Sequence, residues 1–366
     1  MVGSPYSSLK VIHHRDKLEQ LKKGEHLVPT QVQLFISDTC NQACSWCSYR
    51  MVGYDTSELF VLYEPNGKVI RNPKRMIPYD KVCEILEDCR DMGVKATQYT
   101  GGGEPTAHPD VKKIFQHTLK NGLDLALVTN GMLMPKVYDE LVRAKWVRIS
   151  IDAGNAGSYA VTRGSTSEVY GRVWANVEEL VRLKEKTDAN DLIIGIGFVV
   201  SRDNWREVVE CTKRAKEAGV DNIRLSGLFQ SDDAEYFKSF YRQAADLCVR
   251  AKALETKHFK VFNMFGDRVE DLAQHHPDYE FCGYQQFNTL IGGDLNVYRC
   301  CVTAYNLRGL IGSLAKQSFR ELWESAEKQS KFVDFDATKC PRCMFNNKNR
   351  TILYALSDDP AHVNFI

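Results

Sequence analysis

The sequence predicts an α/β fold, in which a partial (β/α)6 TIM-like barrel is followed by a small C-terminal domain rich in cysteine. Three observations support this prediction. Six short β-rich runs alternate with helical patterns between residues 31 and 228. These runs are largely apolar, which is typical of parallel strands covered on both faces. The composition then changes, and residues 282 to 345 hold five of the twelve cysteines.

The expected strands all lie in the first two thirds of the chain. They are Gln31–Ser37, Lys95–Thr100, Leu123–Thr129, Trp146–Asp152, Leu192–Val200 and Asp221–Leu228. Apolar residues at helical spacing lie between them, for example Val169, Val173 and Val177. Strand–helix units of this kind join by right-handed crossovers into a parallel sheet. We find no seventh or eighth unit, so we expect an open barrel of six units.

The same patterns divide the chain into five parts. We expect an N-terminal extension at residues 1–30, the barrel at 31–245 and a helical linker at 246–281. The cysteine-rich domain follows at 282–345, and a C-terminal tail occupies 346–366. Within the cysteine-rich domain, GGDLN at Gly292–Asn296 is typical of a β-hairpin turn.

Composition argues against several classes of protein, although a local basic patch could still bind nucleic acid. The net charge of +1 gives no overall attraction to nucleic acid or to anionic lipid. The first residues lack the apolar core of a secretory signal, and the longest strongly apolar run, Leu192–Val200, is too short for a membrane helix. We therefore expect a cytoplasmic protein. In a reducing compartment, clustered cysteines indicate metal or redox chemistry rather than disulfides.

The first cysteine cluster follows the first expected strand. The segment DTCNQACSWCSYR places Cys40, Cys44 and Cys47 in a C-x3-C-x2-C arrangement. Active sites of parallel barrels lie at the carboxyl ends of the strands. A structural zinc ion needs a fourth ligand, and no further Cys or His follows before Cys83. An iron–sulfur cluster with three cysteine ligands leaves one iron open. Zinc binding and simple burial remain the alternatives.

This motif, with an aromatic Trp46 before its last cysteine, resembles the signature of the radical S-adenosylmethionine (SAM) superfamily. The segment TGGGEP at Thr100–Pro105 resembles the glycine-rich segment of that family. Glycines allow a backbone to approach a ligand closely. The resemblance implies a SAM-binding [4Fe–4S] cluster on the three cysteines. It also implies that the backbone at Gly102 and Gly103, with Glu104 nearby, receives the amino group of SAM.

Three more residues are candidates for SAM binding by the same resemblance. Ser150 and Asp152 in RISIDA share one face of a strand, where they would bond ribose hydroxyls. Arg163 in VTRG resembles the arginine that pairs with the SAM carboxylate. Helix caps or turn formers are the alternative for Ser150 and Asp152, and a surface arginine is the alternative for Arg163.

A second set of cysteines lies near the C-terminus, with the spacing C-x17-C…C-x2-C. It consists of Cys282, Cys300, Cys340 and Cys343. On spacing alone, zinc with four thiolates competes with an iron–sulfur cluster. The resemblance implies a SPASM domain or its shortened form, twitch, which binds auxiliary [4Fe–4S] clusters. Five cysteines suit one cluster in a twitch-like domain, and Cys301 is the alternative ligand to Cys300.

The other four cysteines carry no ligand spacing. Cys83, Cys89, Cys211 and Cys248 fall on expected helices, and burial is the simpler interpretation for all of them.

The resemblance also implies a reaction. SAM is cleaved reductively to a 5′-deoxyadenosyl radical, which abstracts a hydrogen atom from a substrate, and an external donor such as flavodoxin or ferredoxin supplies the electron. We expect a small polar substrate, such as a sugar, aminocyclitol or nucleotide, to be oxidised or rearranged. Peptide maturation, by a crosslink or an epimerisation, and modification of nucleic acid are the alternatives, and a zinc-binding interaction protein is a more distant one.

Overall fold

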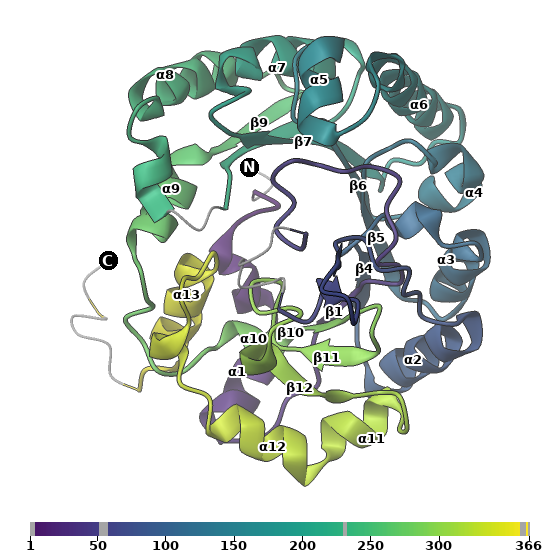
Figure 1. Ribbon diagram of the computed structural model, residues 1–366. Helices are drawn as coiled ribbons and strands as arrows, with labels where there is room; N and C mark the ends of the chain where they lie inside the picture. The colour runs from purple at the N-terminus through teal and green to yellow at the C-terminus, as the bar shows by residue number, and fades with distance from the viewer. Residues whose placement is uncertain (1–3, 51–57, 230–232, 359–363, 365–366) are drawn as a thin grey trace.

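The computed structural model describes residues 4–50, 58–229, 233–358 and 364. Ten strands of this part form one sheet, in the order β12-β11-β10-β1-β4-β5-β6-β7-β8-β9. The sheet curves around the centre of the molecule, and helices cover its outer face (Figure 1). All neighbours from β10 through β1 to β9 pair in parallel. The predicted α/β partial barrel is therefore confirmed.

All six expected strands are present. They are β1 (Gln31–Leu34), β4 (Ala96–Tyr99), β5 (Asp124–Thr129), β6 (Trp146–Ser150), β7 (Ile193–Val200) and β8 (Asn222–Gly227). The helices that cover them are α2 (Tyr79–Met92), α3 (Val111–Lys120), α4 (Tyr138–Leu141), α6 (Ser167–Lys186), α7 (Val208–Glu217) and α8 (Tyr241–Lys252). Strand and helix side chains together bury one large apolar core between the sheet and its outer layer.

The prediction of a helical linker at 246–281 is partly wrong. Helix α8 ends at Lys252, and the chain then forms β9 (Lys260–Met264), which pairs in parallel with β8, before α9 (Phe265–Ala273). This is a seventh strand–helix unit. Only Val261 is buried in β9, so the strand lacks the apolar run by which the other six were recognised.

The cysteine-rich region continues the same sheet. Its strand β10 (Asn288–Ile291) pairs in parallel with β1, and β11 (Asn296–Tyr298) and β12 (Leu310–Ser313) follow in antiparallel fashion. The turn predicted at GGDLN joins β10 to β11, closed by a bond from Leu295 N to the Gly292 carbonyl. Helices α10 (Tyr284–Phe287), α11 (Phe319–Glu324) and α12 (Ala326–Val333) complete the region.

The first helices and the last helix of the chain pack together on the side where the sheet is open (Figure 1). The N-terminal η1 (Ser8–His13) and α1 (Arg15–Lys22) contact α13 (Asn346–Leu356), which forms most of the expected tail. A small apolar cluster lies between them, made of Val11, Leu18, Leu27, Phe287 and Ile352. The Tyr6 ring also packs edge-on against Phe262 of β9, with centroids 5.0 Å apart. The N-terminal extension thus contacts both β9 and Phe287, the residue before β10.

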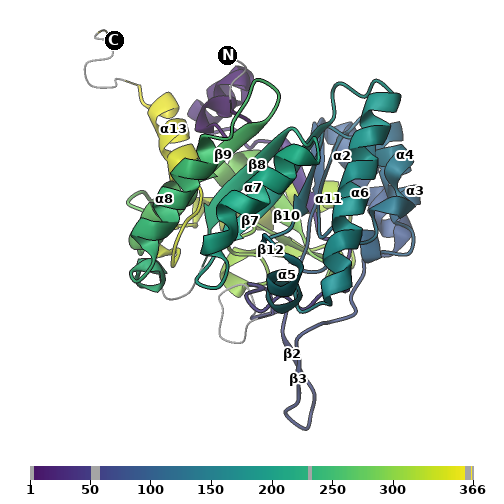
Figure 2. The same ribbon diagram turned by 90° about the horizontal axis from the view of Figure 1, so that it is seen from above.

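Two other features lie outside the barrel wall. Between the first cysteines and α2, β2 (Leu62–Tyr63) and β3 (Val69–Ile70) form a hairpin that projects from the body of the molecule (Figure 2). The apolar C-terminal end, HVNFI, lies almost wholly outside the described residues. Among the helices described, none has the length and apolar character needed to cross a membrane.

Candidate active site

The loop after β1 carries Cys40, Cys44 and Cys47, and all three thiols are half-buried. Polar groups of neighbouring side chains point at two of the sulfurs. Asn130 Nδ2 lies 4.0 Å from Cys40 Sγ, and Arg50 Nη1 lies 3.8 Å from Cys47 Sγ. Such donors stabilise thiolates and tune the potential of a cluster. The loop therefore fits a thiolate-bound iron–sulfur cluster.

Burial also affects the protonation of this loop. Desolvation raises the pKa of the Cys44 thiol to about 11. A thiol with this pKa holds its proton at neutral pH when no metal is present. Since only the thiolate ligates metal, cluster binding at Cys44 releases a proton.

Helix α5 (Ala156–Arg163) supports the cysteine loop from behind. Ala43 N donates to the Arg163 carbonyl at 3.1 Å, and Ser45 N donates to the Thr162 carbonyl at 3.2 Å. The helix ends at Gly164, whose φ is +52°. A Cβ at Gly164 would lie 2.3 Å from the Ala43 carbonyl oxygen. Only glycine therefore allows the end of α5 to approach the loop so closely.

The glycine-rich segment runs along the other side of the loop. Gly103 N donates to the Ser37 carbonyl at 3.1 Å, and Glu104 N donates to the Thr39 carbonyl at 2.9 Å. A Cβ at Gly103 would lie 2.3 Å from the Thr39 carbonyl oxygen, and one at Gly102 would lie 2.4 Å from the Phe60 ring. The structure thus brings Gly102 and Gly103 beside the cysteines, and their lack of side chains is needed for packing there.

Glu104 is buried, and its carboxylate fastens the loops together. It accepts hydrogen bonds from Thr106 N at 3.1 Å, Thr129 Oγ1 at 2.6 Å and Asn130 N at 2.8 Å. These bonds fix the end of β5 next to the cysteine loop. Asn130, whose backbone N bonds to Glu104, also points its side chain toward Cys40.

Asp152 and Arg163, predicted to contact different parts of SAM, pair with each other. Arg163 Nη1 donates to Asp152 Oδ2 at 2.6 Å, and both side chains are buried. Val199 N donates to Asp152 Oδ1 at 2.7 Å, and Arg163 Nε donates to Gln42 Oε1 at 3.0 Å. The alternative of a surface arginine at position 163 is therefore wrong.

The remaining two candidates lie close to this pair. The Arg163 guanidinium is 5.9 Å from the centroid of the Trp46 ring, so Trp46 joins the pair to the cysteine loop. Ser150 ends β6 two residues before Asp152 and is half-buried.

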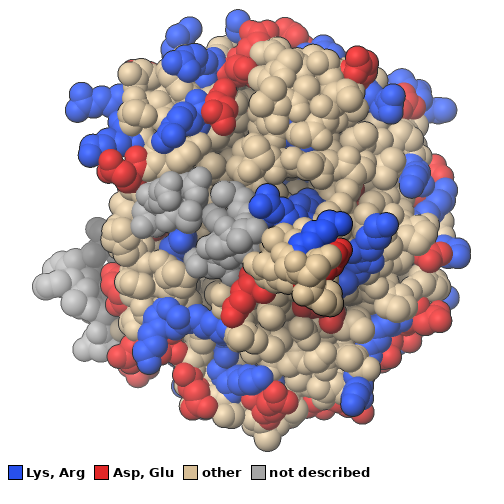
Figure 3. All heavy atoms as spheres, viewed as in Figure 1, with Lys and Arg blue, Asp and Glu red and all other residues tan. Residues whose placement is uncertain are grey.

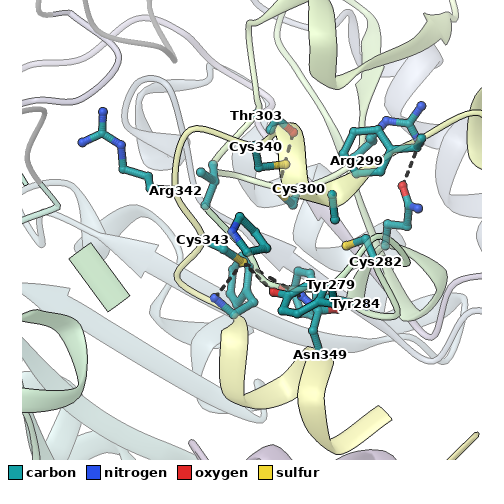
Figure 4. A pocket seen from close by; sticks show the side chains of 16 residues that line it. Tyr279, Cys282, Tyr284, Arg299, Cys300, Thr303, Cys340, Arg342, Cys343 and Asn349 are labelled. Carbon is teal, nitrogen blue, oxygen red and sulfur yellow. Dashed lines mark hydrogen bonds between the residues drawn. The ribbon is translucent and has the colours of Figure 1, made fainter. Parts of the chain in front are cut away.

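The second set of cysteines surrounds one small cavity of about 30 Å³ (Figure 4). Its lining includes Cys282, Cys300, Cys340 and Cys343. Phe345 N donates to Cys343 Sγ at 3.3 Å, the Tyr279 hydroxyl donates to the same sulfur at 3.5 Å, and Thr303 Oγ1 lies 3.5 Å from Cys300 Sγ. Burial raises the pKa of Cys340 to about 12 and that of Cys343 to about 11. Enclosed thiols with aligned donors fit a buried cluster.

Cys301 points elsewhere. It does not line the cavity of the four cysteines but a larger cavity of about 500 Å³ inside the barrel. Within the described ranges, no three Cys, His, Asp or Glu side chains are arranged as ligands of a single metal ion.

The barrel cavity lies between the two cysteine sites. Trp46, Ser48 and Tyr49 of the first cysteine loop line it on one side. Tyr284 and Phe345 line both this cavity and the one of the four cysteines, and their rings stack with centroids 3.9 Å apart. A molecule in the barrel is therefore separated from the second site by one aromatic layer.

Sequence reasoning missed Asp38, which is fully buried two residues before Cys40. Its carboxylate accepts from Arg75 Nε at 2.8 Å and from the Tyr305 hydroxyl. A Cβ at Gly293 would lie 2.8 Å from this carboxylate. Asp38 thus joins the cysteine loop to the C-terminal region. The sequence did contain a signal for this residue, because an acidic side chain follows directly after a strand that was expected to be buried.

Burial of the four remaining cysteines is largely as expected. Cys89, Cys211 and Cys248 are buried on α2, α7 and α8, whereas Cys83 on α2 is only half-buried.

Two family models match this chain. The Radical SAM superfamily model matches residues 34–199, and the SPASM model, described as an iron-sulfur cluster-binding domain, matches residues 282–344. The first range runs from the end of β1 to β7 of the barrel and includes Cys40, Cys44 and Cys47. The second range includes the four later cysteines.

Curated relatives carry several different names. The AdoMet-dependent heme synthase of Methanosarcina barkeri is 26% identical over 299 residues, covering 75% of this chain and 81% of the relative. The tungsten-containing aldehyde ferredoxin oxidoreductase cofactor-modifying protein of Pyrococcus furiosus is 29% identical over 154 residues, covering 41% of this chain and 43% of the relative. This chain therefore spans less than half of the second relative.

Solved structures with the same fold include two that contain peptides. Streptococcus suis SuiB bound to precursor peptide SuiA has a TM-score of 0.62 at 13% identity, covering 92% of this chain and 73% of that one. The structure of anSMEcpe with bound AdoMet and Kp18Cys peptide has a TM-score of 0.57 at 16% identity, with 88% of each chain covered. The barrel, the two cysteine sites and the two family matches agree: this chain belongs to the radical SAM superfamily and carries a C-terminal SPASM-type iron–sulfur domain, so that its cofactors are SAM, a SAM-binding [4Fe–4S] cluster and an auxiliary cluster.

Proposed function

We propose that this radical SAM enzyme abstracts a hydrogen atom from a small polar molecule bound in the barrel cavity. The observation that carries the proposal is the position of that cavity. It is bordered by the Cys40–Cys47 loop on one side and by the wall of the auxiliary site on the other. When bound, SAM and the reduced cluster supply the 5′-deoxyadenosyl radical. The barrel walls orient the substrate toward the radical and exclude water.

In this proposal, Cys40, Cys44 and Cys47 hold the SAM-binding cluster. The backbone at Gly102 and Gly103 receives the SAM amino group, and Glu104 keeps that segment in place through its bonds to the end of β5. Trp46, Ser150, Asp152 and Arg163 surround the rest of SAM. Because Asp152 and Arg163 already pair, SAM binding there requires either a shared contact or a rearrangement of the pair.

The auxiliary cluster is proposed to exchange electrons rather than to bind substrate. Four cysteines surround its cavity, enough to occupy all four irons, so no iron is left open for a ligand. The stacked Tyr284 and Phe345 rings separate it from the barrel cavity by one layer. A cluster held by these four cysteines would lie behind that layer and could accept the electron left on a substrate radical, so that the reaction would be a net oxidation. An external flavodoxin or ferredoxin as donor and a cytoplasmic location also belong to the proposal.

The test begins with SAM cleavage. The reconstituted chain, given SAM and dithionite under anaerobic conditions, should release 5′-deoxyadenosine, measured by liquid chromatography. The Cys40→Ala/Cys44→Ala/Cys47→Ala variant should release none and hold about half of the iron, because one of two clusters is lost. Cys83→Ala, on the outer helix α2, is the control and should behave like the parent chain. Stoichiometric zinc without sulfide would refute the proposal.

Peptide maturation is the second candidate. Among the solved structures alone it has more support than a small-molecule reaction, because SuiB and anSMEcpe are both described with bound peptides. A deuterium-transfer experiment separates the two. Cells that naturally produce this chain are grown in D₂O, and their extract is divided into small-molecule and peptide fractions. The enzyme is then incubated with SAM, reductant and each fraction in turn. Only the fraction that contains the substrate should give deuterated 5′-deoxyadenosine, detected by mass spectrometry.

A further inference from the structure

The lining of the barrel cavity is strongly positive. None of the described residues that line it is Asp or Glu, whereas six of them are basic: Lys10, Lys145, Arg148, Arg224, Arg268 and Lys348. This is not a property of the whole molecule, whose net charge is +1. On the face shown in Figure 3, acidic and basic side chains are mixed around the periphery. Positive charge is thus concentrated inside the barrel.

Ion pairs neutralise only part of this charge. Lys145 pairs with Asp191 at 3.2 Å, and Arg268 pairs with Asp271 at 3.5 Å. In contrast, Arg148, Arg224 and Lys348 make no ion pair with any described residue, and all three are half-buried. The buried Arg224 Nε also has no hydrogen-bond partner. Three cations from β6, β8 and α13 therefore face the cavity without a partner anion among the described residues.

Their proximity is unfavourable when the cavity holds no anion. Burial, and next the charges of Arg148 and Arg268, lower the pKa of Arg224 to about 9. Burial, followed by Lys10, also lowers the pKa of Lys348. Like charges on partly buried side chains repel each other, and a bound anion would relieve this repulsion.

The strand between two of these cations, β7, carries a glycine opposite each of them. In the sheet, Gly195 of β7 is opposite Arg148 of β6, and Gly197 is opposite Arg224 of β8. A Cβ at Gly195 would lie 2.6 Å from Asn222 Oδ1. One at Gly197 would lie 3.5 Å from Arg148 Cδ. The Asn222 amide therefore leaves no room for a side chain at Gly195, and Gly197 lies at van der Waals distance from the Arg148 side chain.

From this arrangement we propose that the substrate is a small molecule carrying a phosphate or carboxylate group, which Arg148, Arg224 and Lys348 bind inside the barrel. Guanidinium groups bind both kinds of anion with two parallel hydrogen bonds, and a lysine adds a point charge. Trp46 and Tyr49 line the same cavity, so an anion on these cations would hold the rest of the molecule toward the SAM-binding loop. The proposal deepens the function given above and rests on it.

The test is a binding measurement, independent of turnover. The cluster-loaded chain is titrated calorimetrically, at low salt and with saturating SAM. The probes are inorganic pyrophosphate, citrate, UDP, uridine and an acidic hexapeptide. We expect pyrophosphate or citrate to bind, UDP to bind far more tightly than uridine, and added KCl to weaken each anion. Because a hydrogen bond to a charged group contributes about 1.5–3 kcal/mol, Arg148→Gln and Arg224→Gln should each weaken anion binding at least about tenfold. Lys348→Gln provides a third, independent variant on another element.

The matched control is Arg182→Gln, which removes the same charge from the exposed outer face of α6. It should bind anions as the parent chain does. Iron content and circular dichroism confirm that each variant is folded and loaded. The proposal is overturned if no anion binds, if the cavity variants bind as tightly as Arg182→Gln, if SAM displaces the anion, or if only an acidic hexapeptide binds. Loss of 5′-deoxyadenosine formation with intact anion binding would instead overturn the proposed function alone.

Discussion

Two adjacent cysteines show how much depends on single residues. Cys300 lines the cavity with three other cysteines, whereas Cys301 lines the barrel cavity between the two cluster sites. From the sequence, either residue could be the ligand, because their distances along the chain from the other three cysteines differ by only one position. The backbone after β11 turns one thiol toward each cavity, and this orientation is not visible in the spacing.

We therefore expect Cys300→Ala and Cys301→Ala to differ in cluster content. Loss of Cys300 removes one of four ligands from a buried site, so the iron bound per chain should fall from about eight to about four. Loss of Cys301 should leave the iron content unchanged. Each variant is the control for the other, and iron and sulfide analysis after anaerobic reconstitution measures both. If Cys301→Ala loses the iron and Cys300→Ala keeps it, the ligand assignment is reversed.

At the scale of elements, the cysteine loop owes its position to α5 as well as to β1. Gly164 allows the end of this helix to reach the loop, and Ala43 and Ser45 donate to its last carbonyls. The motif C-x3-C-x2-C was recognisable in the sequence, and so was VTRG. The contact between these two segments could not be predicted from the sequence. It depends on the left-handed backbone of Gly164 and on a crossover that brings distant parts of the chain together.

Gly164→Ala should consequently disturb the first cluster site. The backbone at this position has a φ of +52°, and an alanine Cβ would lie 2.3 Å from the Ala43 carbonyl oxygen. The substitution should therefore force the loop and the helix apart. We expect lower occupancy of the SAM-binding cluster and slower SAM cleavage, with the auxiliary cluster retained. Gly171→Ala in α6 is the matched control, since nothing lies within 4 Å of its Cβ position, and it should stabilise the helix by up to about 1 kcal/mol. Equal iron content in both variants would contradict the expectation.

The sequence predicted the barrel strands well where they were apolar and bounded by turns. All six such strands are present, but β9 was taken for helical linker because Val261 is its only buried residue. The pairing of β10 with β1 was also missed. It joins residues more than two hundred positions apart, and no local pattern encodes such a pairing. Long-range placement, rather than element type, was the main gap.

At the scale of the whole molecule, the two ends of the chain complete the barrel. The sheet has free edges at β9 and β12, and η1, α1 and α13 occupy the open side. Tyr6 packs on β9, and Lys348 of α13 lines the barrel cavity. Regions labelled as extension and tail from the sequence are therefore parts of the wall around the site.

Ile352→Ala should reveal this role of the termini. The side chain is 2% exposed and packs with Val11, Leu18 and Phe287, so its truncation leaves a cavity and should lower the free energy of unfolding by about 2–5 kcal/mol. Tyr354→Ala, two residues later on the same helix and 63% exposed, is the control and should change stability by less than about 0.5 kcal/mol. Because α13 carries Lys348 into the barrel, Ile352→Ala should also weaken pyrophosphate binding, whereas Tyr354→Ala should not. Urea denaturation and calorimetry measure the two effects, and equal behaviour of the two variants would show that the termini do not support the cavity.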